Sequence, residues 1–206
     1  MYLTKTPEAV KPFAADLVWN FSRLEKTIYF TFDDGPTPGV TEAVLEILKD
    51  FRAKATFFCI GGNVKAHPGL FMRIQDEGHT VGNHSWNHMS GWKFSNFSYF
   101  KNILECAELV HSNLFRPPYG RITRPQVSVL KKRFSIVMWD VLSGDWKQDL
   151  DHEKCLINVI SNGRQGSIVV FHDSLKAEKN MLYALPRALR HYADRGYMFK
   201  AIPQET

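Results

Sequence analysis

The chain has 206 residues, of which 44% are hydrophobic and 23% are charged, and its formal net charge at pH 7 is +5. This length suits one domain with a substantial core, and no apolar run approaches the roughly 18 residues that span a membrane. The densest basic cluster, residues 131–133, has no interleaved aromatic side chains, so we expect no nucleic-acid partner.

Strand-like and helix-like segments alternate along the chain. Short apolar runs predict strands at residues 27–32, 55–60, 80–83, 114–116, 135–139, 167–171 and 198–202. Apolar residues at helical spacing predict helices at residues 41–51, 68–77, 96–111, 124–133, 152–161 and 180–194. This alternation predicts an α/β fold with a mainly parallel sheet and helices packed outside it.

The length of the chain bears on how such a sheet closes. Seven strand–helix units would close into a barrel, but 206 residues are few against the roughly 250 of a full (β/α)8 barrel. We therefore expect an incomplete or distorted barrel. The alternative, an open doubly wound sheet, would normally carry a glycine-rich phosphate loop, and the Gly61-Gly62 pair lacks the spacing and the lysine of one.

Cysteine usage and the N-terminus bear on the cellular compartment. Cys59, Cys106 and Cys155 are isolated and odd in number, so we expect reduced, packed thiols rather than a disulfide framework. Pro12 and Asp16 interrupt anything resembling a signal-peptide core. The location stays open, with the cytoplasm favoured over the cell envelope by these two features.

The unusual polar residues follow the C-terminal ends of the predicted strands. They are Asp33 and Asp34 after the first strand, His84 and His88 after the third, residues 116–120 after the fourth, Asp145 and Trp146 beyond the fifth, and His172 and Asp173 at the end of the sixth. In a parallel barrel these points share one rim, which is where active sites are built.

Two of these groups together suggest a metal site. The adjacent charges of Asp33 and Asp34 are costly unless a cation or a shared proton offsets them. His84 and His88 are spaced i, i+4, so on a helical turn they would face the same way and could chelate one ion. With one of the two aspartates they would form an open hydrolytic metal set, at which the ion activates water and polarises a carbonyl.

The remaining carboxylate and a third histidine could carry protons. The second aspartate would be the general base, and a nearby cation would keep it ionised. His172 is the natural acid, since it ends a run too apolar to be anything but a buried strand. Each of these features alone also has a simpler explanation. The two aspartates could form a polar turn, the two histidines could lie on a solvated helix, and His172 could be a hydrogen-bonded histidine at a strand end.

Over about residues 27–202 the chain resembles the polysaccharide deacetylases of carbohydrate esterase family 4, the NodB homology domain. Three ordered motifs carry the resemblance: Thr31-Phe32-Asp33-Asp34-Gly35-Pro36, His84-Ser85-Trp86-Asn87-His88 and Arg116-Pro117-Pro118-Tyr119-Gly120. The resemblance implies a single catalytic domain, a distorted (β/α)7 barrel at residues 27–203, preceded by an N-terminal extension at residues 1–26.

The resemblance also implies an activity, the metal-dependent hydrolysis of N-acetyl or O-acetyl groups on a glycan. We expect N-acetylglucosamine units of peptidoglycan or of chitin-like oligosaccharides as the first substrates, and a monomeric protein. Asp34, His84 and His88 would hold one divalent ion, usually zinc, with cobalt or another divalent ion as alternatives.

Roles for the remaining residues come from the same resemblance. Asp33 would be the base and Arg116 would hold its orientation. His172 would be the acid, and the neighbouring Asp145 would favour its protonated form. The backbone N–H of Tyr119 would stabilise the oxyanion. The residues expected to contact the substrate are Pro117, Tyr119, Trp146 and Val170, with Trp146 walling the pocket for the acetyl methyl group.

Two positions depart from the motifs of the family. Leu142 stands where the family often has aspartate, and Val170 stands where it usually has leucine, which would make the acyl pocket slightly roomier. These departures motivate one alternative, a non-catalytic glycan-binding module of the same fold. Because a fold alone does not determine the substrate, a small-molecule amide or formamide hydrolase on the same barrel stays a second alternative.

An aromatic-rich stretch follows the two histidines of the second motif, and it consists of Trp86, Trp92, Phe94, Phe97, Tyr99 and Phe100. These rings could stack on sugars, or they could pack a long loop against the next helix. Because aromatic side chains dominate protein cores, we expect packing.

Overall fold

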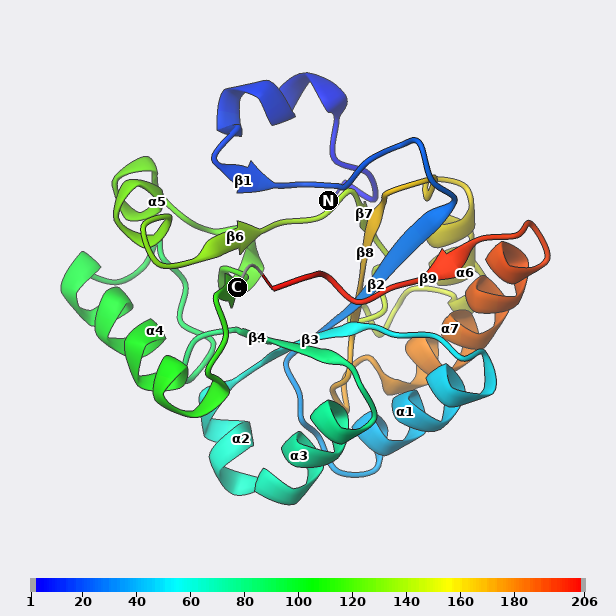
Figure 1. Cartoon of the computed structure of the whole chain (residues 1–206), viewed down its shortest axis with the longest axis horizontal. Coiled ribbons are helices and arrows are strands. Elements are labelled where there is room, and N and C mark those ends of the chain that lie inside the picture. Colours follow the sequence, from blue (N-terminus) through cyan, green and yellow to red (C-terminus); the bar gives the residue numbers. More distant parts are fainter. Residues whose placement is uncertain (1–2, 205–206) are drawn as a thin grey trace.

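Continuous apolar runs form the strands of one curled parallel sheet, and amphipathic segments form the helices around it (Figure 1). The computed structural model describes residues 3–204. The strands are β1 (Leu17–Val18), β2 (Thr27–Asp33), β3 (Thr56–Cys59), β4 (Thr80–Asn83), β5 (Leu114–Phe115), β6 (Ser135–Val137), β7 (Val141–Leu142), β8 (Ile168–His172) and β9 (Met198–Phe199). The helices are α1 (Val40–Asp50), α2 (Gly61–Ala66), α3 (Pro68–Asp76), α4 (Asn96–Val110), α5 (Arg124–Leu130), α6 (His152–Ile160) and α7 (Glu178–Ala193), with short 3-10 helices η1 (Glu8–Ala14) and η2 (Pro118–Gly120).

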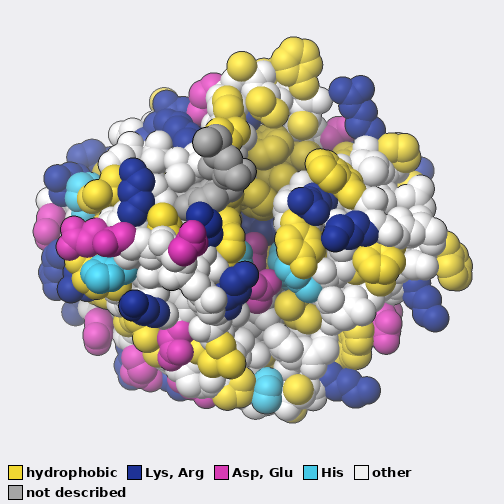
Figure 2. All heavy atoms as spheres, turned by 180° about the vertical axis from the view of Figure 1, so that it is seen from behind, with side chains coloured by type: hydrophobic (Ala, Val, Ile, Leu, Met, Phe, Trp, Pro, Cys, Tyr) yellow, Lys and Arg dark blue, Asp and Glu magenta, His cyan; other side chains and the backbone are white. Residues whose placement is uncertain are grey.

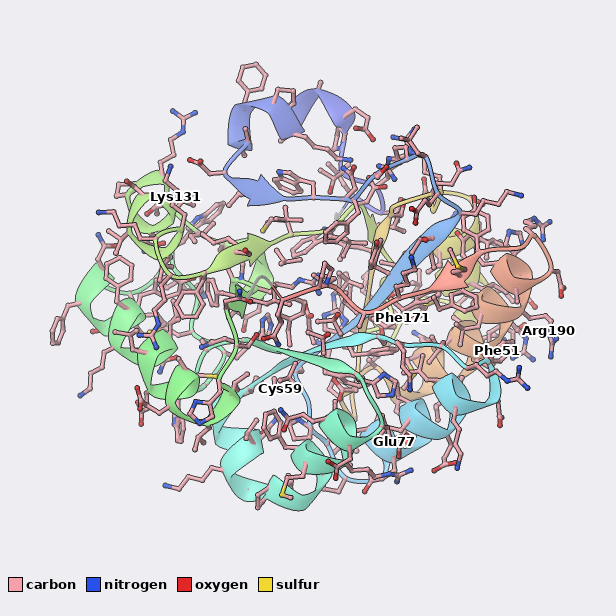
Figure 3. All side chains as sticks on the ribbon, in the orientation of Figure 1. Phe51, Cys59, Glu77, Lys131, Phe171 and Arg190 are labelled. Atoms are coloured by element: carbon pink, nitrogen blue, oxygen red, sulfur yellow. The ribbon has the colours of Figure 1, made fainter. Side chains whose placement is uncertain are left out.

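The strand β2 pairs with three others, β3, β8 and β9. The strand order is β1-β6-β5-β4-β3-β2-β8-β7, with β9 also paired to β2, and these pairings are parallel. In the core, the ring of Phe32 stacks with Phe57 of β3 at 5.0 Å and with Phe171 of β8 at 6.2 Å. At the periphery α1 and α7 lie side by side, and the guanidinium of Arg190 lies over the ring of Phe51 (Figure 3).

The distorted barrel expected from the sequence is confirmed as an incomplete, curled parallel barrel (Figure 1). Each predicted strand and helix has a counterpart in the structure. The strands and α-helices that the sequence analysis missed are β1, β7 and α2, and it also missed the short 3-10 helices η1 and η2. Both missed strands are two residues long, and α2 begins at a Gly-Gly pair that disfavours a helix prediction.

The N-terminal segment fills the gap between the two ends of the sheet. On one side β1 pairs with β6. On the other side Lys5 forms an antiparallel bridge with Val141 of β7, and the Thr6 N–H donates to the carbonyl of Asp140 over 2.9 Å. Residues before β2 therefore complete the circle that the parallel strands leave open.

A buried carboxylate ties this segment to the sheet. The Oδ1 atom of Asp140 lies 2.7 Å from Nζ of Lys11, and its Oδ2 atom lies 2.9 Å from Nη2 of Arg23. The Ser167 hydroxyl also donates to Oδ2 over 2.6 Å. Burial alone would raise the pKa of Asp140, but these partners outweigh it and hold the pKa below its usual value.

Cys59, Cys106 and Cys155 are buried and free, which confirms the expectation of packed thiols without disulfide bonds. Burial raises the pKa of each thiol, so all three stay protonated and unreactive near neutral pH. Across residues 3–204, every helix is too short or too polar to cross a membrane.

We predict that Asp140→Asn lowers the free energy of unfolding by about 2–3 kcal/mol at pH 7, because it removes the charge that two cations share. The pKa of Asp140 is lowered by folding. The stabilisation is therefore present above the pKa of the unfolded chain and is lost as the pH falls through the folded value. Urea unfolding of both proteins over this pH range measures the difference.

Asp16→Asn is the matched control for this comparison. Asp16 pairs with Lys131 at 3.0 Å, but both side chains are exposed. An exposed ion pair of this kind contributes less than about 1 kcal/mol. Equal losses of stability in the two variants would contradict the anchoring role of Asp140.

Candidate active site

The carboxyl ends of the strands surround a hollow on the face of the molecule seen in Figure 2, which shows histidine and acidic side chains beside it. The cavity has a volume of about 640 Å³. It is lined by Asp33, Asp34, His84, His88, Tyr119, Trp139, Leu142, Trp146, Val170, His172, Ser174 and Lys176. Most of the site residues predicted from the sequence therefore meet in one place.

The register of the sheet explains part of this convergence. β2 and β8 pair in parallel, and the pairing sets Asp33 opposite His172. Two residues that are far apart in the sequence thus end their strands side by side. Tertiary pairing, rather than any local motif, brings the two expected proton carriers together.

A group of potential metal ligands lies at the edge of the cavity. One ligand atom from each of Asp34, His84 and His88 lies within 4.8 Å of the others. Oδ1 of Asp34 is 3.3 Å from Nε2 of His88 and 3.8 Å from Nε2 of His84. The same oxygen is buried and has no hydrogen-bond partner among the described residues. A buried carboxylate oxygen facing two imidazole nitrogens suits a divalent cation.

The protonation state of His84 also suits a ligand. Its Nδ1 atom lies 2.8 Å from the carbonyl oxygen of Arg116, which can only accept, so Nδ1 carries the proton and donates. Nε2 is then left with its lone pair toward Asp34. Burial lowers the pKa of His84 to about 4, so the ring is neutral at pH 7.

The expectation that His84 and His88 lie on a helical turn is wrong. Both follow β4 in a loop, in which Ser85 and His88 adopt left-handed backbone conformations with φ of 64° and 61°. Side-chain caps hold this loop: the Ser85 N–H donates to Oδ1 of Asn83 over 2.8 Å, and the Met89 N–H donates to Oγ of Ser85 over 3.0 Å. The two rings converge because the loop is tightly bent, not because of helical periodicity.

The carboxylate of Asp33 is paired with a buried arginine. Nη1 of Arg116 donates to Oδ1 of Asp33 and to Oγ1 of Thr31, each over 2.7 Å. The other guanidinium nitrogens donate to the carbonyls of Val137 and Met138. Burial alone would raise the pKa of Asp33, but the charge of Arg116 leads the effects that lower it below its usual value. Asp33 is therefore ionised at neutral pH.

His172 has the opposite electrostatic environment. Its Nδ1 lies 2.8 Å from Oδ1 of Asp145, and its backbone N–H donates to Oδ2 of the same carboxylate over 2.7 Å. Burial alone would lower the pKa of His172, but Asp145 outweighs it and raises the pKa to about 9. The rings of Trp146 and His172 pack in an edge-to-face arrangement, with centroids 4.9 Å apart and an interplanar angle of 64°.

The other predicted residues take different places. Trp146 and Val170 line the cavity, and so does Tyr119, which is exposed and has its ring centroid 4.4 Å from that of His88. Pro117 is buried and is not among the lining residues. Arg116 and Asp145 are also fully buried, so they contact the cavity only through Asp33 and His172.

Asp173 is a structural partner of the site to which the sequence analysis assigned no role. Its Oδ1 atom accepts from the Gly35 N–H over 3.0 Å, and its Oδ2 atom accepts from the Thr41 hydroxyl over 2.6 Å. The carboxylate thus clamps the loop that follows Asp34 against the start of α1. Its position next to His172 at the end of an apolar strand was the only signal in the sequence.

We predict that Gly35→Ala destabilises the protein by about 2–3 kcal/mol, because a Cβ atom at Gly35 would overlap the carboxylate of Asp173. Gly69→Ala is the matched control, since a Cβ atom there meets nothing within 4 Å and position 69 lies inside α3. Gly69 is in the first turn of α3, so alanine there should change the stability by less than about 1 kcal/mol. Chemical denaturation of both variants measures the contrast, and an unaffected Gly35→Ala protein would refute the clamp.

Comparison with known proteins connects this site to a family. The family model described as polysaccharide deacetylase matches residues 22–133. A peptidoglycan-N-acetylglucosamine deacetylase of Bacillus cereus is 32% identical over 200 residues, which cover 91% of this chain and 92% of that protein. The peptidoglycan-N-acetylmuramic acid deacetylase PdaC of Bacillus subtilis is 31% identical over 186 residues, 87% of this chain but only 38% of the length of that protein.

A solved structure supports the same relationship. The crystal structure of the Bc1960 peptidoglycan N-acetylglucosamine deacetylase matches with a TM-score of 0.89 and 28% identity, covering 96% of this chain and 95% of that one. The family match spans more than half of the chain, and it includes the Asp33-Asp34 and His84–His88 motifs. The chain belongs to the polysaccharide deacetylase family, carbohydrate esterase family 4.

Proposed function

We propose that this protein is a metal-dependent deacetylase that hydrolyses N-acetyl or O-acetyl groups of a glycan. N-acetylglucosamine units of peptidoglycan or of chitin-like oligosaccharides are the substrates we propose first. One observation carries the proposal: in a single cavity, an ionised carboxylate and a protonated imidazole flank the Asp34, His84 and His88 group. The B. cereus relative, named as a peptidoglycan-N-acetylglucosamine deacetylase, supports the choice of substrate class.

The proposed reaction divides the work between the two aspartates of the first motif. A zinc or another divalent ion held by Asp34, His84 and His88 would polarise the acetyl carbonyl and make water more acidic. Asp33 takes a proton from the attacking water, as a base that the charge of Arg116 keeps ionised.

The acid step belongs to His172. Asp145 keeps its imidazole protonated and fixes the ring, so Nε2 can give its proton to the departing nitrogen or oxygen of the sugar. The backbone N–H of Tyr119 would donate to the oxyanion that forms between these two steps. Trp146, Leu142 and Val170 supply an apolar wall of the cavity that suits an acetyl methyl group.

The alternatives make different demands on the same residues. A non-catalytic glycan-binding module, which Leu142 and Val170 motivate, has no use for a base and an acid held in opposite charge states. A small-molecule amide or formamide hydrolase would use the same chemistry on a compact substrate. The opposite charges of Asp33 and His172 support an enzyme rather than a binding module. Assays with both kinds of substrate distinguish a glycan deacetylase from a small-molecule amidase.

Purified protein supplied with zinc or cobalt should release acetate from chitin oligosaccharides, peptidoglycan or acetylated xylan, and faster than from small N-acyl compounds. Asp33→Asn should keep the metal and lose at least about 100-fold in kcat, since it removes the base. His84→Ala should lose both metal and activity. Enzymatic acetate determination and metal analysis of each variant check these results, and metal-loaded protein that releases no acetate from any glycan would overturn the proposal.

We further predict that Asp145→Asn moves the alkaline limb of the kcat/KM profile to lower pH. The carboxylate raises the pKa of His172 against the effect of burial, so its removal leaves burial dominant and the imidazolium loses its proton sooner. A bound metal ion would shift the pKa of His172 in the same way in wild type and in Asp145→Asn. The quantity to measure is therefore the difference between their pH profiles. An unchanged or upward-shifted limb would count against His172 as the acid.

A further inference from the structure

The expectation that the aromatic stretch after the histidines packs inside the protein is wrong for three of its rings. Tyr99 is fully buried, but Trp92 is 64% exposed, Phe97 is 78% exposed and Phe94 is exposed as well. A large exposed aromatic side chain loses the stabilisation that burial would give, so its neighbourhood merits a functional explanation.

Trp92 lies at the end of a row that begins at the candidate metal site. The ring of Tyr119 is 4.4 Å from the ring of His88. The guanidinium carbon of Arg121 lies over both neighbouring rings, 5.7 Å from the centroid of Tyr119 and 5.4 Å from the centroid of Trp92. Tyr119 lines the cavity, so this Tyr119–Arg121–Trp92 row leads from the cavity onto the outer surface.

The loop that carries Trp92 is fixed in place. The indole Nε1–H donates to the carbonyl of Ile122 over 3.3 Å, and the Gly91 N–H donates to the carbonyl of Arg121 over 3.2 Å. The buried side chain of Gln126 donates to the carbonyl of Gly91 over 2.8 Å. A Cβ atom at Gly91 would overlap Gln126, so this approach requires glycine. The exposed ring is therefore held in one orientation before any ligand arrives.

We propose that Arg121 and Trp92, which continue the row from Tyr119, bind the sugar units next to the one in the cavity and so favour longer glycans over short ones. This inference rests on the proposed function and extends it. Each unit of such a glycan presents an apolar ring face and a polar edge. The row offers both kinds of contact, since two exposed aromatic rings flank a guanidinium that can donate to hydroxyl, amide or carboxylate oxygens.

Other occupants fit the row less well. An apolar helix or strand of a protein partner would require a continuous apolar face, and a cation between the two rings interrupts it. A small N-acyl compound would fill the cavity without reaching Trp92. A glycan that continues out of the cavity contacts the rings without a break, and its binding at remote units contributes to positioning the reacting acetyl group.

The test compares acetate release from a short and a long substrate. The probes are N,N′-diacetylchitobiose and hexa-N-acetylchitohexaose, and the measured quantity is the ratio of their kcat/KM values. Trp92→Ala should reduce the hexamer-to-dimer ratio roughly tenfold, as expected for the loss of one aromatic contact. Trp92→Phe should keep most of the wild-type hexamer-to-dimer ratio, and Arg121→Gln should lower that ratio. Phe97→Ala, which removes a still more exposed ring on α4 outside the row, should leave the ratio unchanged.

Titration calorimetry with the hexamer separates this inference from the proposed function. Weaker hexamer binding by Trp92→Ala than by Phe97→Ala supports sugar binding by the row, even if no acetate is released. The absence of acetate release overturns only the deacetylase proposal. If Trp92→Ala lowers both kcat/KM values equally, or if the hexamer binds equally well to Trp92→Ala and wild type, the row does not bind sugars and the inference is wrong. Thermal unfolding of each variant verifies that the comparison is made between folded proteins.

Discussion

The site depends on one buried charge, the guanidinium of Arg116. Its donors bind Thr31 and Asp33 on β2 and the two carbonyls at the end of β6, and its Cζ atom lies 4.1 Å from the ring centroid of Phe58 on β3. Its own carbonyl accepts from Nδ1 of His84. A fully buried cation is tolerated only when its hydrogen bonds and its counter-charge are all satisfied. Satisfying the guanidinium therefore joins three strands and orients the carboxylate of Asp33, while the backbone carbonyl of the same residue sets the tautomer of His84, a candidate metal ligand.

A second ion pair, between Asp145 and His172, mirrors the first across the β2–β8 register. In one pair a buried cation holds an acid ionised, and in the other a buried anion holds a base protonated. Their pKa values are pushed apart by environment rather than by residue type. Both Arg116 and Asp145 are fully buried, so water screens neither ion pair, and Asp33 and His172 keep opposite charges in one cavity.

The sequence was informative where structure follows from local chemistry. Strands such as β2 and β8 are buried on both faces, so their uninterrupted apolar runs reveal them. The short strands β1 and β7 carry no such signal, because two residues become strands only when the sheet supplies their partners. The spacing of His84 and His88 correctly paired the two residues but predicted the wrong backbone, since positive φ values at Ser85 and His88 leave no trace in a periodicity. Asp173 binds a backbone N–H 138 positions away, and no motif encodes such a contact.

The closure of the sheet by its N-terminal segment has a consequence for the order of folding. The partners of this segment lie late in the chain: Lys11 and Asp140 are 129 positions apart, and Thr6 and Trp139 are 133 apart. Contacts of such separation are slow to form, because a long loop must close before any of them is gained. During synthesis this segment emerges well before its partners and is therefore among the last parts of the domain to reach its final position. Until then the strands meet as an open sheet, with the edges of β6 and β7 unpaired and able to pair with another chain.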